Sequence, residues 1–294
     1  MQENENDIIK RVRKIEIKTR GLSREIFAGK YHTAFRGRGM SFSEVREYRA
    51  GDDVRDIDWN VTARSRRPHI KVYEEERELT MMLLVDVSAS RMFGSGDRLK
   101  KQITTEIAAV LAFSATQNND KVGCILFSDH VEKFIPPKKG RSHILMIIRE
   151  LIGFQPTAQK TRLSEGVRYL SNLLKKRSTA FILSDFLDPE EDREELRDAL
   201  KVAGGKHDLV AIRLVDPRER ELPDVGILEL QDAETGKIEW VDTSSRALRD
   251  HYAAHWARRA EEMERILKQN RIDTATISTE EDYVVELIKL FKQR

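Results

Sequence analysis

Residues 81–90 read Met81-Met82-Leu83-Leu84-Val85-Asp86-Val87-Ser88-Ala89-Ser90. The first five residues form a short, continuous apolar run, which is typical of a strand covered on both faces of a parallel sheet. A carboxylate and two hydroxyls follow at alternate positions, 86, 88 and 90. Because ligands of open α/β sheets collect at the carboxyl ends of the strands, the stretch predicts a buried strand with a polar site at its end.

Apolar strand patterns and amphipathic helix patterns alternate from residue 80 onward. Strands are predicted over residues 81–85, 122–127, 131–135, 179–183, 209–215 and 274–278. Helices are predicted over residues 97–117, 143–152, 163–174, 190–202, 245–270 and 282–291. Asp97 is a candidate N-cap, Gly204-Gly205 a candidate helix end, and Pro136-Pro137 the end of an edge strand. This alternation predicts an α/β fold with a doubly wound, mostly parallel, Rossmann-type sheet.

The residues before the first apolar run have a different character. A helix is predicted over residues 8–18, a Gly- and Arg-rich stretch follows at 35–42, Gly51 marks a turn, and residues 69–79 are extended. We therefore predict an N-terminal segment, 1–78, made of a helix and a β-containing elaboration, followed by an α/β domain, 79–294. The alternating runs around residues 234–237 predict a hairpin insertion near 227–242.

Composition narrows the class of protein. The chain has 294 residues, 39% of them hydrophobic, and a formal net charge of +2, which argues against binding of nucleic acid over the whole surface. A single cysteine, Cys124, excludes an intramolecular disulfide framework and suits a reducing compartment. The N-terminus is polar and acidic, and the apolar runs are too short to span a bilayer. These features predict a cytoplasmic protein without a membrane span.

Three loops at predicted strand or helix ends carry oxygen ligands. They are Asp86, Ser88 and Ser90 after the first strand, Thr161 before a helix, and Asp185 after the strand 179–183. Together they offer two carboxylates and three hydroxyls, with no His or Cys. Such hard ligands suit Mg²⁺ rather than zinc, and Mn²⁺ or Ca²⁺ would also fit.

The pattern Asp-x-Ser-x-Ser, a distant Thr and a later strand-end Asp resembles the metal-ion-dependent adhesion site of von Willebrand factor A domains. That resemblance implies metal contacts from Ser88, Ser90 and Thr161, with Asp86 and Asp185 acting directly or through water. Two departures stand out. Thr157-Ala158-Gln159-Lys160 occupies the place of the usual glycine pair, and Phe186 follows Asp185 where glycine is common.

A second resemblance lies upstream of the apolar run. The signature consists of Gly37-Arg38-Gly39, Phe42, Arg46, Tyr48, Gly51-Asp52-Asp53, Arg55, Ile57-Asp58-Trp59 and Ala63-Arg64. It is similar to that of the bacterial family called domain of unknown function fifty-eight, over roughly residues 20–240. In that family the signature precedes a von Willebrand A-like domain, and members are often encoded beside MoxR-type AAA+ ATPases.

We therefore expect a non-enzymatic module in which a partner protein supplies an Asp or Glu to the metal. The resemblance implies that this partner is a MoxR-type AAA+ ATPase or one of its clients, in chaperone-like maturation or a stress response. Two alternatives stay open: a metal-dependent phosphohydrolase using Asp86, and a metal-independent adaptor acting through residues 20–78. Asp52, Asp53, Asp56 and Asp58 are expected to cap backbone amides or to pair with Arg49, Arg55 and Arg64 around Trp59.

Overall fold

The computed structural model describes residues 10, 12–19, 21–22, 39–76, 79–96, 98–187, 192–232 and 236–294. The chain forms two compact units, a smaller one, Gly37–Leu79, and a larger one that joins Met1–Arg36 to Thr80–Arg294. The larger unit contains the sheet predicted from the apolar runs. Among the described residues, no helix combines the length and the apolar character needed to cross a membrane.

The larger unit is built on a six-stranded sheet in the order β10-β7-β6-β3-β4-β5. The strands are β3 (Thr80–Asp86), β4 (Lys121–Phe127), β5 (Val131–Lys138), β6 (Thr179–Ser184), β7 (Asp208–Val215) and β10 (Asp273–Ser278). Only the pair of β4 and β5 is antiparallel. The chain leaves β3 toward β4 and later returns to its other side at β6, so the winding reverses between β3 and β6. This confirms the predicted doubly wound, mostly parallel sheet.

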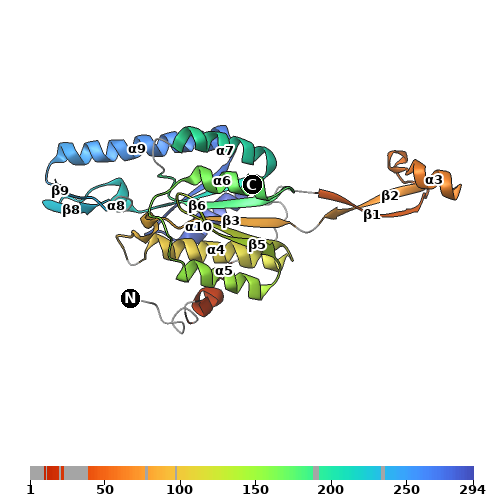
Figure 1. Cartoon of the computed structure of the whole chain (residues 1–294), viewed down its shortest axis with the longest axis horizontal. Helices are drawn as coiled ribbons and strands as arrows, with labels where there is room; N and C mark the ends of the chain where they lie inside the picture. Colours follow the sequence, from red (N-terminus) through yellow and green to blue (C-terminus); the bar gives the residue numbers. More distant parts are fainter. Residues whose placement is uncertain are drawn as a thin grey trace. The chain divides into compact units, whose positions relative to one another are not determined.

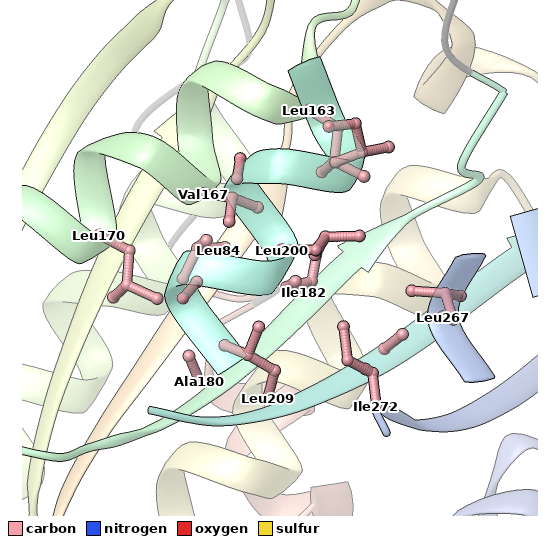
Figure 2. Packing of buried hydrophobic residues seen from close by; sticks show 14 of the residues in the cluster. Leu84, Leu163, Val167, Leu170, Ala180, Ile182, Leu200, Leu209, Leu267 and Ile272 are labelled. Atoms are coloured by element: carbon pink, nitrogen blue, oxygen red, sulfur yellow. The ribbon is translucent and has the colours of Figure 1, made fainter. Parts of the chain in front are cut away.

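Helices cover both faces of the sheet (Figure 1). One face carries α6 (Leu163–Leu173), α7 (Arg193–Lys206) and α9 (Arg246–Gln269), and the other carries α4 (Lys100–Gln117), α5 (Arg141–Gly153) and α10 (Tyr283–Gln293). Figure 2 shows the first of these interfaces, where Val167 and Leu200 lie over the strand residues Leu84 and Ile182. Because apolar side chains on both faces of the strands are buried, β3 and β6 hold their carboxyl ends in fixed positions.

Close packing of α6 on the sheet depends on a glycine. A Cβ atom at Gly166 would lie 2.9 Å from ring atoms of Phe127, at the end of β4. The carbonyl of Phe127 in turn accepts a hydrogen bond from the amide of Val87, directly after β3. The approach of α6 is therefore coupled to the backbone that leads into the 86–90 loop.

Several element boundaries differ from the predicted ones. Helix α4 begins at Lys100, with Leu99 as its N-cap residue. The predicted cap, Asp97, lies outside the described residues, and so does residue 190, the predicted start of α7. Gly204-Gly205 do not end α7, which continues to Lys206. Strand β5 continues through Pro136 and Pro137. It lies at the edge of the sheet and its register shifts beside the prolines, so the sheet does not need the N–H groups that proline lacks.

The remaining predicted elements of the larger unit are present. Strands β8 (Ile227–Gln231) and β9 (Ile238–Asp242) form the antiparallel hairpin, and Ser245 and Asn270 cap α9. The short elements η2 (Ala89–Met92) and α8 (Pro217–Arg220) follow β3 and β7. In the predicted N-terminal helix, residues 10 and 12–19 are helical, and Glu16 and Lys18 form ion pairs with Arg141 of α5 and Glu106 of α4.

The smaller unit pairs β1 (Gly39–Glu47) with β2 (His69–Glu76) and inserts η1 (Val54–Asp56) and α3 (Trp59–Ser65) between them. Asp53 and Asp58 cap η1 and α3, as predicted. The alternative prediction, that aspartates and arginines form ion pairs around Trp59, is wrong. Asp52 forms a bidentate pair with Arg46 at 2.7 and 2.8 Å, and Trp59 is 68% exposed, because the helix that carries it turns this residue outward.

Candidate metal centre

The predicted ligands from two strands meet where the winding of the sheet reverses. Asp86 is the last residue of β3, and Asp185 follows β6 directly. Val85 pairs with Leu183 across these neighbouring strands, which places the two aspartates at the same edge. Both residues are buried, each 5% exposed. This is the position at which open α/β sheets bind their ligands.

The 86–90 loop connects three of the predicted ligands by hydrogen bonds. The amide of Ser88 donates to Oδ1 of Asp86 at 2.9 Å, and the hydroxyls of Ser88 and Ser90 lie 3.1 Å apart. The Ser90 hydroxyl also lies near Asp185, where its interaction with the carboxylate contributes to lowering the pKa of Asp185. Asp86, Ser88, Ser90 and Asp185 therefore form one connected polar group.

Thr161 is buried in a loop that lies beside the 86–90 loop. The amide of Ala89 donates to the carbonyl of Gln159 at 3.1 Å, and the amide of Arg162 donates to the carbonyl of Ser128 at 2.9 Å. The Thr161 hydroxyl, however, forms no hydrogen bond to the other four ligand residues, all of which the structure describes. The structure thus brings the two loops together through their backbones.

Glu132 of β5 supports the part of this loop that lacks the usual glycine pair. Its carboxylate accepts hydrogen bonds from the amides of Thr157 and Ala158 and from the hydroxyls of Thr157 and Ser128. Burial raises the pKa of Glu132, but these donors outweigh it and hold the pKa below its usual value. The loop conformation is therefore set by a carboxylate and does not require glycine.

Phe186 is the second departure from the adhesion-site pattern, and its backbone adopts a strained conformation. Its φ is +56°, in the left-handed region, although the side chain is only 3% exposed and belongs to the apolar core. Its amide donates to the hydroxyl of Ser184, which in turn donates to Oδ2 of Asp86 at 2.8 Å. The backbone turn at Phe186 thus positions a donor on Asp86.

Three charged residues at the site were not among the predicted ligands: Lys100, Glu219 and Arg91, the last of which lines the small cavity and is 6% exposed. Nζ of Lys100 lies 3.0 Å from Oδ2 of Asp185 and 2.5 Å from Oε1 of Glu219, and its side chain is 2% exposed. The sequence contains a signal that Lys100 faces the interior, because the residue shares a helical face with the buried Ile103 and Ile107. Glu219, in a short helix after β7, had no comparable local signal.

The electrostatics of the two aspartates differ because their neighbours differ. Burial and, next, the charge of Asp185 raise the pKa of Asp86 to about 6. Burial would also raise the pKa of Asp185, but the charge and the hydrogen bond of Lys100 lower it below the ordinary value. At neutral pH the site therefore holds two carboxylates, one of them paired with an ammonium group.

The residues fit a small, hard cation. A cavity of about 10 Å³ is lined by Asp86, Ser90, Lys100 and Asp185, among others, which is room for about one water-sized sphere. Carboxylate and hydroxyl oxygens are ligands of Mg²⁺, Mn²⁺ and Ca²⁺. In the part of the chain that the structure describes, no group of three or more His, Cys, Asp or Glu residues forms a metal site, so this site relies on hydroxyls.

A larger cavity of about 300 Å³ opens beside the candidate metal centre. Ser90 and Asp185 line it on the side of the sheet, and Tyr252, His255, Trp256 and Arg259 of α9 line it on the other. The same two ligand residues therefore face both the small cavity and the larger one. A group entering from the larger cavity would reach the candidate metal centre.

A doubly wound sheet with Asp-x-Ser-x-Ser after its central strand defines a von Willebrand factor A-like domain. The chain belongs to the family described as "Protein of unknown function DUF58", whose model matches residues 44–262. An uncharacterized protein of Mycobacterium tuberculosis is 31% identical over 260 residues, which are 88% of this chain and 80% of the relative. One from Mycobacterium avium is 28% identical over 162 residues, 54% of this chain and 93% of that protein.

The chain is also similar to solved structures at low sequence identity. The conserved hypothetical protein BatB from Bacteroides thetaiotaomicron has a TM-score of 0.49 and 14% identity, over 73% of this chain and 98% of that one. The SpRpn10 VWA domain has a TM-score of 0.37 and 13% identity, over 74% and 95%.

Proposed function

We propose that this chain is a non-enzymatic, metal-dependent protein-interaction module. Mg²⁺ is the cation that we expect, with Mn²⁺ or Ca²⁺ as substitutes, held by Asp86, Ser88, Ser90, Thr161 and Asp185. The observation that carries the proposal is the connected group of Asp86, Ser88, Ser90 and Asp185 beside two cavities. When bound, the cation would offer a coordination position to a carboxylate of a partner protein.

The charges around the site favour an anionic partner group. Asp86 and Asp185 supply two negative charges, and the hydroxyls of Ser88, Ser90 and Thr161 supply none. Lys100 pairs with both Asp185 and Glu219, and the buried Arg91 adds a second positive charge near Asp86. A divalent cation held there keeps an excess of positive charge, and in a site this buried that excess attracts an Asp or Glu side chain strongly.

For the partner we propose a MoxR-type AAA+ ATPase or one of its clients. This part rests on the family, whose members are often encoded beside such ATPases, and it implies a cytoplasmic, chaperone-like role in maturation or stress response. The test is a pull-down between the two purified proteins, in Mg²⁺ and in chelator. Capture that depends on Mg²⁺ supports this partner, and equal capture under both conditions removes the metal from the interaction.

Calorimetry tests the metal directly. The wild type should bind Mg²⁺ at one site, and Asp86→Ala should abolish binding because it removes a central ligand. Asp198→Ala, an exposed residue of α7, is the matched control and should bind as the wild type does. Absence of binding by the wild type would overturn the proposal. Release of phosphate from a generic phosphate ester, lost in Asp86→Ala, would favour the phosphohydrolase instead.

A second candidate function is a metal-independent adaptor, and the surface of the smaller unit favours it. Trp59 is 68% exposed and Val54 59% exposed, with the exposed Arg55 next to Val54. Trp and Arg are the residues that most often dominate protein interfaces. Capture of the ATPase that survives chelator and Asp86→Ala, but is lost in Trp59→Ala, would establish the adaptor and displace the metal-dependent module.

A further inference from the structure

Two arginines lie against a tryptophan that lines the larger cavity. The guanidinium carbon of Arg213, on β7, is 5.0 Å from the ring centroid of Trp256, and that of Arg220, at the end of α8, is 4.9 Å from it. Trp256 itself lines the cavity together with Ser90 and Asp185. The consecutive elements β7 and α8 therefore bring two positive charges to one aromatic ring of α9.

These three side chains hold buried donors without acceptors. Nε and Nη2 of Arg213, Nε of Arg220 and Nε1 of Trp256 are inaccessible to solvent and have no hydrogen-bond partner among the described residues. Arg213 is only 6% exposed. Buried donors are almost always satisfied in proteins, and a buried charge without a partner is unfavourable. The arrangement is that of a site lacking its acceptor.

The nearby carboxylates do not act as acceptors for these buried donors. Burial lowers the pKa of Arg213, the charge of Arg220 lowers it further, and Asp185, Glu264 and Glu219 only partly oppose them. Asp185 and Glu219 hydrogen-bond Lys100, and Glu264 pairs with Lys268 at 2.6 Å. The two guanidinium groups thus repel each other while the carboxylates around them are engaged elsewhere.

We propose that Arg213, Arg220 and Trp256 form a binding site for an oxyanion, a carboxylate or a phosphate group, beside the larger cavity. Guanidinium groups present planar pairs of N–H donors that match the oxygens of both anions, and the indole N–H adds one more donor. An anion placed there relieves the repulsion between the two arginines. The site needs no metal, so its occupancy does not depend on the function proposed above.

Fluorescence of Trp256 provides the test. The full chain carries three tryptophans, and Trp59→Phe with Trp240→Phe leaves Trp256 as the only one. Both replaced residues are exposed, 68% and 69%, so the fold should tolerate the changes. This protein, in chelator and at constant ionic strength kept with NaCl, is titrated with inorganic phosphate and separately with glutarate, whose carboxylates resemble acidic side chains.

We expect a saturable fluorescence change with at least one anion, and at least tenfold weaker binding in Arg213→Gln and in Arg220→Gln. Arg218→Gln, an exposed arginine of the same short helix, should bind as the parent does. Saturation by phosphate alone identifies a phosphate group, and saturation by glutarate identifies a carboxylate. The site is refuted if neither anion saturates, or if both arginine variants bind like the parent.

Melting temperature gives a second readout that separates binding from folding. Without anion, Arg213→Gln should melt no lower than the parent, because it removes a buried, unpaired charge. The anion that saturates the fluorescence should raise the melting temperature of the parent and leave that of Arg213→Gln unchanged. A large loss of stability in Arg213→Gln without any anion would mean that the arginine is satisfied within the fold, which overturns the proposal.

Discussion

Nζ of Lys100 lies 3.0 Å from Oδ2 of Asp185, and both side chains are almost entirely buried. A permanent positive charge therefore sits on one of the two carboxylates expected to hold a metal. It reduces the repulsion between the two aspartates in the absence of a divalent cation, although burial and, next, the charge of Asp185 still raise the pKa of Asp86. A cation that binds at Asp86 must then share Asp185 with an ammonium group, which should weaken its affinity.

Lys100→Met removes this ammonium group and leaves the buried Asp185 and the partly buried Glu219 without their partner. Breaking a buried ion pair from one side costs about 3–5 kcal/mol of stability, so we expect a decrease of that order in the free energy of unfolding. Mg²⁺ should then stabilise the variant more than the wild type, because it replaces the missing charge. Urea unfolding with and without MgCl₂ measures both effects.

The control for this prediction is Lys201→Met, an exposed lysine of α7, which should leave stability and the Mg²⁺ effect unchanged. A Lys100→Met protein that gains less from Mg²⁺ than the wild type would show that Lys100 does not compete with the cation.

Phe186 combines a buried aromatic side chain with a left-handed backbone. Phe186→Ala should destabilise the protein by about 3–5 kcal/mol through loss of core packing. Phe186→Gly loses the same packing but relieves the left-handed strain, which is about 1–2 kcal/mol for a non-glycine residue. The glycine variant should therefore unfold at higher urea concentration than the alanine variant. The opposite order would mean that φ at this position is not positive in solution.

Gly166 and Gly205 should respond to alanine in opposite ways. At Gly166 a Cβ would meet the Phe127 ring at 2.9 Å, and overpacking of this kind costs about 1–3 kcal/mol. At Gly205, in the last turn of α7, the Cβ would meet no atom within 4 Å, so alanine should stabilise by about 0.5–1 kcal/mol through helix propensity. Thermal unfolding of both variants checks this, and equal shifts would contradict the close approach of α6.

We expect the structure of the smaller unit to depend on pH through Asp52. The hydrogen bond from Arg46, with that from the amide of Arg49, lowers the pKa of Asp52 from 3.8 to about 2. A carboxyl group whose pKa is lower in the folded state stabilises that state above its unfolded pKa, and the effect is lost as the pH falls toward 2. At pH 5, hydrogen exchange of the Arg49 amide should be several-fold faster in Asp52→Asn than in the wild type.

The ratio of the two exchange rates should approach one as the pH is lowered through about 2, because the wild-type carboxylate is then protonated. A ratio that stays constant between pH 5 and pH 2 would show that the Arg46–Asp52 pair does not hold this turn.

Much of the fold was predictable because its signals are local. The apolar run 81–85 and its counterparts at 122–127 and 179–183 predict buried strands from their length and composition alone. The element boundaries at Lys100, Lys206 and Lys138 were less predictable, since tertiary packing overrides cap and breaker preferences there.

By itself, the sequence determined the order of strands and helices. It also determined that Asp86, Ser88, Ser90 and Asp185 lie at strand ends, because strand periodicity and the α/β topology bring such positions to one edge of the sheet. Metal binding by these residues stays a prediction. Only the tertiary structure decided that Lys100 and Glu219 reach that edge and that Arg213 and Arg220 meet at Trp256. These contacts depend on which surfaces of distant segments pack together, and the energy that selects them is long-range packing and desolvation, which no local pattern encodes.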